Sequence, residues 1–301
     1  MVTSVVADNV PATGKNNNSK VPDVDQVLSQ VKKCSDTVNL RSQALTPQMQ
    51  QQACDILLQQ EAFFHETFKT EGKPVKHDFN RNLRANIYHT REDYIKYAGH
   101  HFNIPTDNGG MYLEGYPDIP GNQAEFIAYE KEGQIWNLQH EYVHYLDGRY
   151  NLYGDFCLSL HDSHSPPENC VQPAPVYPHT VWWSEGLGEY IVHPNHYPKT
   201  FATLKKELGK YKLSEIFNTS YSQNGGSSRV YSWGYAAVRF MIENHRKEIE
   251  DMLKFTRAGD YARYQALVKN WGNRFDQEFE QWLKEVTSNI QLAEDNNKKK
   301  Q

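Results

Sequence analysis

The stretch His140-Glu141-Tyr142-Val143-His144 stands near the middle of this 301-residue chain and decides its fold. Residues four apart share one face of an α-helix, so both imidazoles can point at one metal ion. Glu141 projects beside them, where a carboxylate can take a proton from a water molecule. Apolar helical neighbours are supplied by Ile135, Trp136, Leu138 and Val143. Gly148 is placed to end the helix. The plainer alternative is a half-buried helix with two histidines and an ordinary Glu.

A third ligand is needed, because catalytic zinc usually takes three protein ligands and keeps one position open. Residues 182–191, Trp-Trp-Ser-Glu-Gly-Leu-Gly-Glu-Tyr-Ile, predict a second helix that carries Glu185 and Glu189 four residues apart. The apolar neighbours indicate that this pair is not fully solvated. We predict that Glu185 is the third ligand and that Glu189 accepts a hydrogen bond from a ligand histidine, which fixes its tautomer.

Other residues compete for places around the metal. Three histidines lie in the proline-rich segment between the two helices, where we expect them to face solvent: His161, His164 and His179. Asp147, three residues after His144, can stand behind that histidine or belong to the surface charge around Arg149. A histidine ligand of the metzincin type is excluded, because its position holds Tyr150.

These two motifs together resemble the peptidase domain of the bacterial collagenases, peptidase family M9, and within it the Vibrio-type branch. The resemblance runs from about residue 34 to about residue 286. It implies a gluzincin zinc peptidase with an α+β, mainly helical, thermolysin-like fold of two lobes. The first lobe would hold a small mixed sheet and the second would be all helical. The resemblance also supports Zn²⁺ ligation by His140, His144 and Glu185.

A double glycine, Gly109-Gly110, precedes a strand-like run that ends at Glu114. A strand that begins there can leave an exposed edge to which a peptide substrate adds as a further strand. From the residues alone, a plain loop is equally compatible. The resemblance favours the edge strand, because the family has a Gly-Gly at the matching place. It also makes Glu114 a candidate ligand of a structural Ca²⁺, although a lone exposed Glu is the default interpretation.

Zinc peptidases of this class need a phenol or an imidazole to hydrogen-bond the oxyanion that forms during hydrolysis. Tyr231 and Tyr235 are the candidates, in a helical segment that follows Gly225-Gly226. Similarity to the collagenases favours Tyr231. Aromatic core packing explains either tyrosine equally well.

Pattern and composition divide the chain into four parts. We expect a disordered segment over 1–22, a catalytic subdomain over 23–197, a helical subdomain over 198–290 and a charged tail over 291–301. The pattern predicts helix from Val24 onward, a helix over 47–71 between Thr46 and Gly72, and strands over 83–88 and 124–129. A capping box at Thr90 predicts a short helix. Later helices centre on 201–208, 213–217, 231–244, 249–255, 261–268 and 275–286.

The net charge of −5 gives no basic footprint for nucleic acid, and no apolar run approaches the length of a membrane span. Neither partner is expected. The four cysteines favour the pairs Cys34–Cys54 and Cys157–Cys170, with four free thiols as the alternative. Paired cysteines and the resemblance imply a secreted, extracellular protein, although residues 1–23 lack a signal-peptide pattern and are typical of a mature form or an excised domain.

The sequence therefore predicts a monomeric zinc metalloendopeptidase that cleaves collagen- and gelatin-type polypeptides, with Glu141 as general base. Cleavage of gelatin and collagen-like peptides is expected rather than attack on the intact triple helix. One alternative is a general gluzincin protease without collagen preference. The other is a catalytically inactive peptide-binding module of the same fold, against which an intact Glu141 argues.

Overall fold

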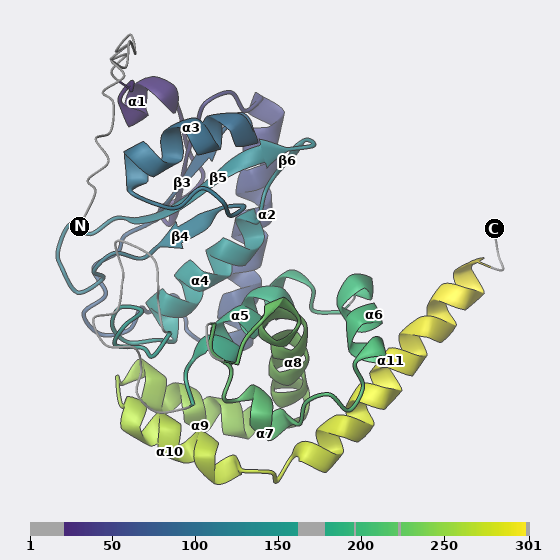
Figure 1. Cartoon of the computed structure of the whole chain (residues 1–301). Coiled ribbons are helices and arrows are strands. Elements are labelled where there is room, and N and C mark those ends of the chain that lie inside the picture. The colour runs from purple at the N-terminus through teal and green to yellow at the C-terminus, as the bar shows by residue number, and fades with distance from the viewer. Residues whose placement is uncertain (1–20, 162–177, 196, 222–223, 299–301) are drawn as a thin grey trace, which may run out of the picture.

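The structure is a computed structural model that describes residues 21–161, 178–195, 197–221 and 224–298. Its first part is built on a six-stranded mixed sheet in the order β1-β2-β3-β5-β4, with β6 paired to β5 (Figure 1). The strands are β1 (Gln30–Lys33), β2 (Val38–Ser42), β3 (Leu83–Tyr88), β4 (Met111–Leu113), β5 (Ala124–Lys131) and β6 (Gln134–Ile135). β2, β3 and β5 run parallel, whereas β1 and β4 are antiparallel to their neighbours.

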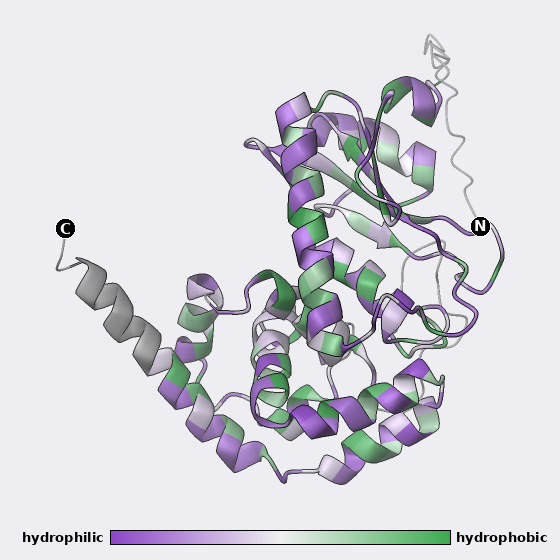
Figure 2. Cartoon of the chain, turned by 180° about the vertical axis from the view of Figure 1, so that it is seen from behind, coloured by the Kyte–Doolittle hydropathy of each residue, from purple (hydrophilic) through white to green (hydrophobic). Residues whose placement is uncertain are grey.

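Helices cover both faces of this sheet. Successive residues of its strands point to opposite faces, and those on either face are buried under helices. Phe126 of β5 packs toward α2 (Pro47–Phe68) and α4 (Leu138–Tyr150). Its neighbour Ile127 faces the other way, into a smaller core under α3 (Arg91–Phe102). Hydrophilic and hydrophobic residues alternate along the long helix α2 (Figure 2). α4 therefore packs against both the sheet and α2.

The described residues after α4 form mainly helices. These helices are α5 (Val181–Val192), α6 (Pro198–Lys206), α7 (Leu213–Ile216), the π-helix η1 (Ser228–Trp233), α8 (Gly234–Asn244), α9 (Arg246–Arg257), α10 (Tyr261–Trp271) and α11 (Asp276–Lys298). α5 packs against α4 on one side and against α8 on the other. A Cβ atom added at Gly186 would lie 2.3 Å from the carbonyl oxygen of Gly234, so the backbones of α5 and α8 touch there.

The predicted α+β class is confirmed, and so are the strands over 83–88 and 124–129. Thr46 caps α2 by accepting a hydrogen bond from the Met49 N–H at 3.2 Å. The predicted end of that helix is wrong: Lys69 already takes a left-handed conformation with φ of 52°, so the helix stops before Gly72. Thr90 caps α3 as predicted, but the helix is 12 residues long rather than short.

Three further expectations about elements are wrong. After the four-residue helix α1 (Val24–Val27), the chain forms β1 and β2 instead of continuing as helix, because β2 finds a partner in the distant β3. Trp136 precedes α4, and Gly148 lies inside α4 rather than ending it. Helix α11 continues to Lys298, so part of the range 291–301, for which the sequence predicted a charged tail, is helical.

One predicted disulfide is confirmed. Cys34, at the end of the β1 strand, is bonded to Cys54 of α2, so the bond ties the β1–β2 hairpin to that helix. The other predicted pair includes Cys170, which lies outside the described residues, as does nearly all of the segment expected to be disordered. Within the part of the chain that the structure describes, no helix combines the length and apolarity needed to cross a bilayer.

Candidate active site

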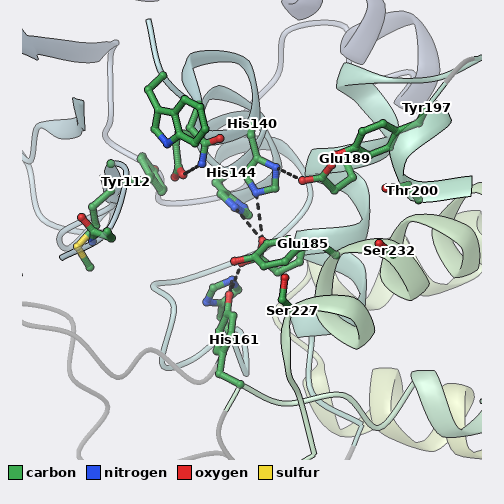
Figure 3. A pocket seen from close by; sticks show the side chains of 18 of the residues that line it. Tyr112, His140, His144, His161, Glu185, Glu189, Tyr197, Thr200, Ser227 and Ser232 are labelled. Carbon is green, nitrogen blue, oxygen red and sulfur yellow. Dashed lines mark hydrogen bonds and ion pairs between the residues drawn. The ribbon is translucent and has the colours of Figure 1, made fainter. Parts of the chain in front are cut away.

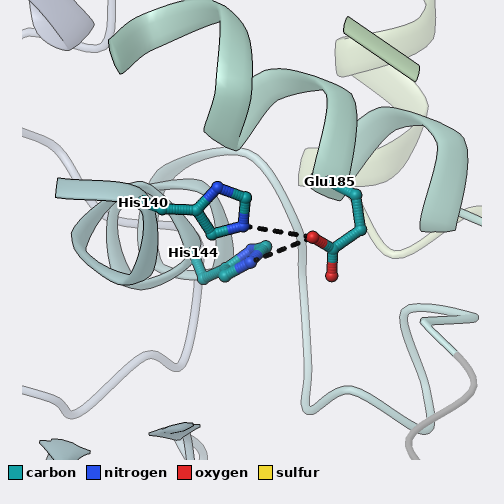
Figure 4. A group of neighbouring side chains, drawn as sticks. All are labelled: His140, His144 and Glu185. Atoms are coloured by element: carbon teal, nitrogen blue, oxygen red, sulfur yellow. Dashed lines mark hydrogen bonds and ion pairs between the residues drawn. The ribbon is translucent and has the colours of Figure 1, made fainter. Parts of the chain in front are cut away.

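Two helices bring the three predicted ligand residues together. α4 supplies His140 and His144 from successive turns of one face, and α5 supplies Glu185 (Figure 4). Glu185 Oε2 lies 3.1 Å from His140 Nε2 and 3.7 Å from His144 Nε2. All three ligand atoms lie within 4.8 Å of one another, and all three side chains are buried. Among the described residues, this is the one cluster of such groups that could hold a metal ion.

The donor set fits a zinc ion. Two imidazole nitrogens and one carboxylate oxygen are the ligand types of His₂Glu catalytic zinc sites. Bonds of about 2.0–2.1 Å at tetrahedral angles would place two ligand atoms about 3.3 Å apart. The observed separations of 3.1 and 3.7 Å bracket that value. The side chains are therefore already near the positions that coordination requires.

The charges around the ligands also favour a cation. Burial alone would lower the pKa of His140, but hydrogen bonds with Glu185 and Glu189 and the nearby Glu141 charge hold it well above its usual value. Burial likewise opposes ionisation of Glu185, yet the two ligand histidines keep its pKa well below its usual value. Buried carboxylates thus surround the two imidazoles and demand a positive charge between them.

Glu189 stands behind His140, as the sequence predicted. Its Oε1 lies 3.1 Å from His140 Nδ1, on the side of the ring opposite Glu185 (Figure 3). This contact favours a proton on Nδ1, so Nε2, which faces Glu185, is the nitrogen that could bind a metal. Burial raises the pKa of the Glu189 carboxyl, but the hydrogen bond with His140 outweighs it, so the pKa is lowered and the group is ionised.

Gly188, which sequence reasoning missed, sets how closely His140 approaches α5. A Cβ atom added there would lie 2.7 Å from His140 Cε1 and 2.9 Å from Nδ1. Any side chain at this position would push the ring out of place. The signal was present as a glycine between two glutamates of a buried helix, where glycine has a low helix propensity and needs a packing reason.

A cavity of about 580 Å³ opens over the three ligands. Glu141 lines it and is only 9% exposed, while Asn137 Nδ2 lies 3.4 Å from Glu141 Oε1. The carboxylate therefore faces the same space as the ligand atoms. Met111 and Tyr112 of β4 and the preceding Gly110 also line the cavity.

The double glycine is closely packed, Gly109 against the Trp136 side chain and Gly110 against the backbone of β5. A Cβ atom on Gly109 would lie 1.9 Å from Trp136 Nε1, and one on Gly110 would lie 3.0 Å from the carbonyl oxygen of Ile127. Both positions therefore need glycine. β4 starts directly after them and forms the end of the sheet order, with β5 on one side. The strand predicted after Gly109-Gly110 thus lies at a sheet edge beside the cavity.

The two candidate tyrosines differ in position. Tyr231, in the π-helix η1, lines the cavity with 39% of its surface exposed and with its ring centroid 6.1 Å from that of His140. π-Helical turns are frequent at functional sites because they re-aim side chains. Tyr235 is fully buried, and its hydroxyl donates to the carbonyl oxygen of His193 at 3.1 Å. The charge of Glu185, more than burial, raises the pKa of Tyr231 well above its usual value, so this phenol remains a donor.

The expectation that the histidines of the connecting segment face solvent is wrong for two of them. His161 is 6% exposed and lines the cavity, and His179 is 4% exposed. Hydrogen bonds from Thr180 to the backbone of residues 159 and 160 fold this segment onto the start of α5. His161 hydrogen-bonds the hydroxyl of Tyr221, which in turn donates to Glu185 Oε1. His164 lies outside the described residues.

Asp147 is buried rather than part of the surface charge. Its carboxylate accepts hydrogen bonds from Asn151 Nδ2 at 2.8 Å and from Trp183 Nε1 at 3.0 Å. Burial raises the pKa of Asp147 to about 6, against the opposing effect of those hydrogen bonds and of the nearby His144. The residue connects α4 to α5 beneath the ligands.

Glu114 is also buried, with 2% of its surface exposed, so the default of a lone exposed Glu is wrong. Its Oε1 lies 2.6 Å from where a Cβ atom of Gly148 would stand. The absence of that atom explains a glycine inside α4. The carboxylate therefore lies against the C-terminal part of the helix that carries the ligand histidines.

Comparison with known proteins agrees with this geometry. A family model described as collagenase, of the M9 peptidases, matches residues 10–282. The chain belongs to this collagenase family. A microbial collagenase of Vibrio alginolyticus is 44% identical over 268 residues, which cover 87% of this chain and 31% of that protein. One from Vibrio vulnificus is 38% identical over 86% of this chain and 30% of that protein. The collagenase ColT of Clostridium tetani is 23% identical over 67% of this chain and 20% of its own length.

The chain thus spans about a third of the length of the Vibrio collagenases that it matches. The ligand residues and Glu141 lie well inside the matched range.

Proposed function

We propose that this chain is the peptidase unit of a zinc-dependent metalloendopeptidase that cleaves collagen- and gelatin-type polypeptides. The observation that carries the proposal is the buried group of His140, His144 and Glu185 beneath a cavity that Glu141 also lines. Names of the relatives supply the substrate class: the Vibrio proteins are called microbial collagenases. The arrangement of the three ligand residues and Glu141 supports the zinc-dependent hydrolysis.

His140, His144 and Glu185 would hold the zinc ion, with Glu189 fixing the tautomer of His140. Bound there, zinc supplies Lewis acidity, which polarises the scissile carbonyl and lowers the pKa of a water molecule. Glu141 accepts the proton of that water and delivers it to the leaving amine. The phenolic hydroxyl of Tyr231 donates a hydrogen bond to the oxyanion that develops on the substrate.

The edge of β4 would align the substrate. Met111 and Tyr112 of this strand line the cavity together with the preceding Gly110, and an extended peptide can add to such an edge as a further strand. We further propose the two-lobe division expected for a thermolysin-like enzyme, with the sheet part over 23–197 and the helical part over 198–290. α4 and α5 both belong to the sheet part, and the contact of α5 with α8 would bring the helical part against the site.

The remaining proposals concern surroundings rather than chemistry. The buried carboxylate of Glu114 against α4 supports it as a ligand of a structural Ca²⁺. The Cys34–Cys54 disulfide supports an oxidising, extracellular location, because such bonds persist there. We propose that the chain acts as a monomer.

Hydrolysis of a fluorogenic Gly-Pro-containing collagen-type peptide, compared with casein, tests the function. Chelator-sensitive cleavage that favours the collagen-type peptide is expected, whereas equal or casein-biased cleavage would leave a general zinc protease. Glu141→Ala should abolish turnover and keep one zinc per chain. The matched control is Glu66→Ala on the exposed side of α2, which should keep full activity. Persistent activity of Glu141→Ala would show that another group is the base.

A further inference from the structure

The two carboxylate oxygens of Glu185 have different surroundings. Oε2 faces both ligand histidines, at 3.1 Å from His140 Nε2 and 3.7 Å from His144 Nε2. Oε1 points away from them and accepts a hydrogen bond from the hydroxyl of Tyr221. The whole side chain is only 5% exposed, so solvent does not compete for Oε1. One oxygen is thus available for a metal and the other is already engaged.

A histidine stands behind this tyrosine. His161 Nε2 lies 3.2 Å from the Tyr221 hydroxyl oxygen. Because the single hydroxyl hydrogen of Tyr221 is directed to Glu185, the oxygen must accept from His161, which therefore carries its proton on Nε2. The resulting chain runs from the His161 N–H to the Tyr221 O–H and on to Glu185 Oε1. Successive donors of this kind polarise one another and strengthen each bond.

His161 is held in place by contacts with neighbouring residues and with the start of α5. The His161 ring stacks on Phe156 with centroids 4.4 Å apart, and its backbone N–H donates to the Phe156 carbonyl oxygen at 3.0 Å. The preceding residues are tied to the start of α5 through Thr180, whose hydroxyl donates to the Ser159 carbonyl oxygen at 2.8 Å. His161 therefore keeps its place relative to the helix that carries Glu185 (Figure 3).

We propose that Tyr221 and His161 are positioning residues that make Glu185 a one-oxygen metal ligand, an inference that rests on the metal-binding role proposed above. A carboxylate whose Oε1 was free could rotate and offer both oxygens to the ion. That would fill the position that a catalytic zinc site keeps open for water or substrate. The hydrogen bond from the Tyr221 hydroxyl keeps Oε1 away from the ion, and the hydrogen bond from His161 keeps that hydroxyl in place.

The test measures zinc affinity rather than turnover alone, by competition with a chromophoric chelator. Tyr221→Phe removes one oxygen atom and keeps the ring, and loss of such an outer partner typically weakens metal binding by about 10–100-fold. Tyr231→Phe is the matched control, because it removes another phenol that lines the cavity, the one assigned to the oxyanion of the substrate. We expect Tyr231→Phe to lose turnover with an unchanged zinc dissociation constant. Equal zinc affinity of Tyr221→Phe and the unsubstituted chain would overturn the proposal.

The visible absorption spectrum of Co²⁺ bound in place of zinc reports the coordination number, which a general loss of metal affinity would not change. In Tyr221→Phe the released oxygen should become an additional ligand, so the visible absorption of bound Co²⁺ should weaken as its coordination number rises. In Tyr231→Phe the spectrum should stay as in the unsubstituted chain. Identical spectra for all three proteins would contradict one-oxygen ligation through Tyr221.

A double-mutant cycle tests whether the two residues act in series. His161→Ala should weaken zinc binding in the unsubstituted chain but add nothing in Tyr221→Phe, and His161→Gln, which keeps an N–H donor, should restore part of the loss. Additive effects would exclude the series arrangement. If the unsubstituted chain binds no zinc, the proposed function itself fails. If it binds zinc and Tyr221→Phe binds it equally well, only the positioning role fails.

Discussion

Gly188→Ala should damage the metal site more than it damages the fold. A Cβ atom at this position would lie 2.7 Å from His140 Cε1. Carbon atoms pack at about 3.5–4.0 Å, so the ring must move by about 0.8 Å or more. Metal–ligand distances tolerate only about 0.2 Å. His140 cannot make this shift and keep both of its contacts, at 3.1 Å to Glu185 and 3.1 Å to Glu189.

The same substitution has a small effect on folding of the zinc-free chain. Alanine gains about 1 kcal/mol over glycine inside a helix. This gain offsets part of the roughly 1–3 kcal/mol that overpacking costs. For zinc, the displaced ligand should raise the dissociation constant by about 10–100-fold, as loss of an orienting partner does. That range corresponds to about 1.4–2.8 kcal/mol of binding free energy.

Gly186→Ala, two residues earlier, is the matched control. Its Cβ atom would lie 2.3 Å from the carbonyl oxygen of Gly234, so it must force α5 and α8 apart. Urea unfolding of the zinc-free chains should therefore show the larger loss for Gly186→Ala, and chelator competition the larger loss for Gly188→Ala. A zinc dissociation constant of Gly188→Ala within twofold of the unsubstituted value would refute the claim that this glycine sets the place of His140.

Three further outcomes follow from the structure. Removing the metal with a chelator should lower the melting temperature, because an ion that binds only the folded chain at 1,000 times its dissociation constant adds about 4 kcal/mol; an unchanged melting temperature would contradict metal binding. In the zinc-free chain, the pKa of Asp147 is raised from 3.8 to about 6, so the folded state holds this proton more tightly than the unfolded state does. Stability should therefore fall as pH rises from about 4 to about 6, by about 3 kcal/mol at 1.36 kcal/mol per pKa unit, and urea titrations of Asp147→Asn should lack this dependence. Replacing Cys34 and Cys54 by Ser opens a loop with a sequence separation of 20 residues, which should cost about 3 kcal/mol of unfolding free energy and leave zinc affinity unchanged in the folded protein.

The sequence predicted those parts of the site that depend on spacing along one helix. His140 and His144 are four residues apart, as are Glu185 and Glu189, and a helix alone puts each pair on one face. The pairing of the two helices followed from the number of ligands that zinc requires. The site residues that depend on local helical geometry were therefore predictable without knowledge of the fold.

What could not be predicted depends on distant parts of the chain. Tyr221 and His161 lie outside regular elements, and only the folded chain brings them within hydrogen-bonding distance of each other and of Glu185. The composition around His161, rich in proline, indicated a solvent-facing loop, whereas backbone contacts near Thr180 fold it inward. β2 was missed for the same reason, because its partner β3 begins at Leu83, far along the chain.

Helix α5 shows why local propensity gave little guidance at the centre of the site. Its two glycines, Gly186 and Gly188, each lower helix propensity by about 1 kcal/mol relative to alanine. One lets the backbone of α8 approach, and the other lets the His140 ring approach. Nearly all of α5 is buried, so packing against α4 and α8 rather than intrinsic propensity holds it in helical form. The helix therefore gives up local stability at the positions that set the distances of Glu185 to its partners. Replacing Gly188 by a better helix former should therefore impair the site, because its Cβ atom would fill space that the His140 ring occupies, whereas replacing Gly186 should disturb the packing of α5 against α8.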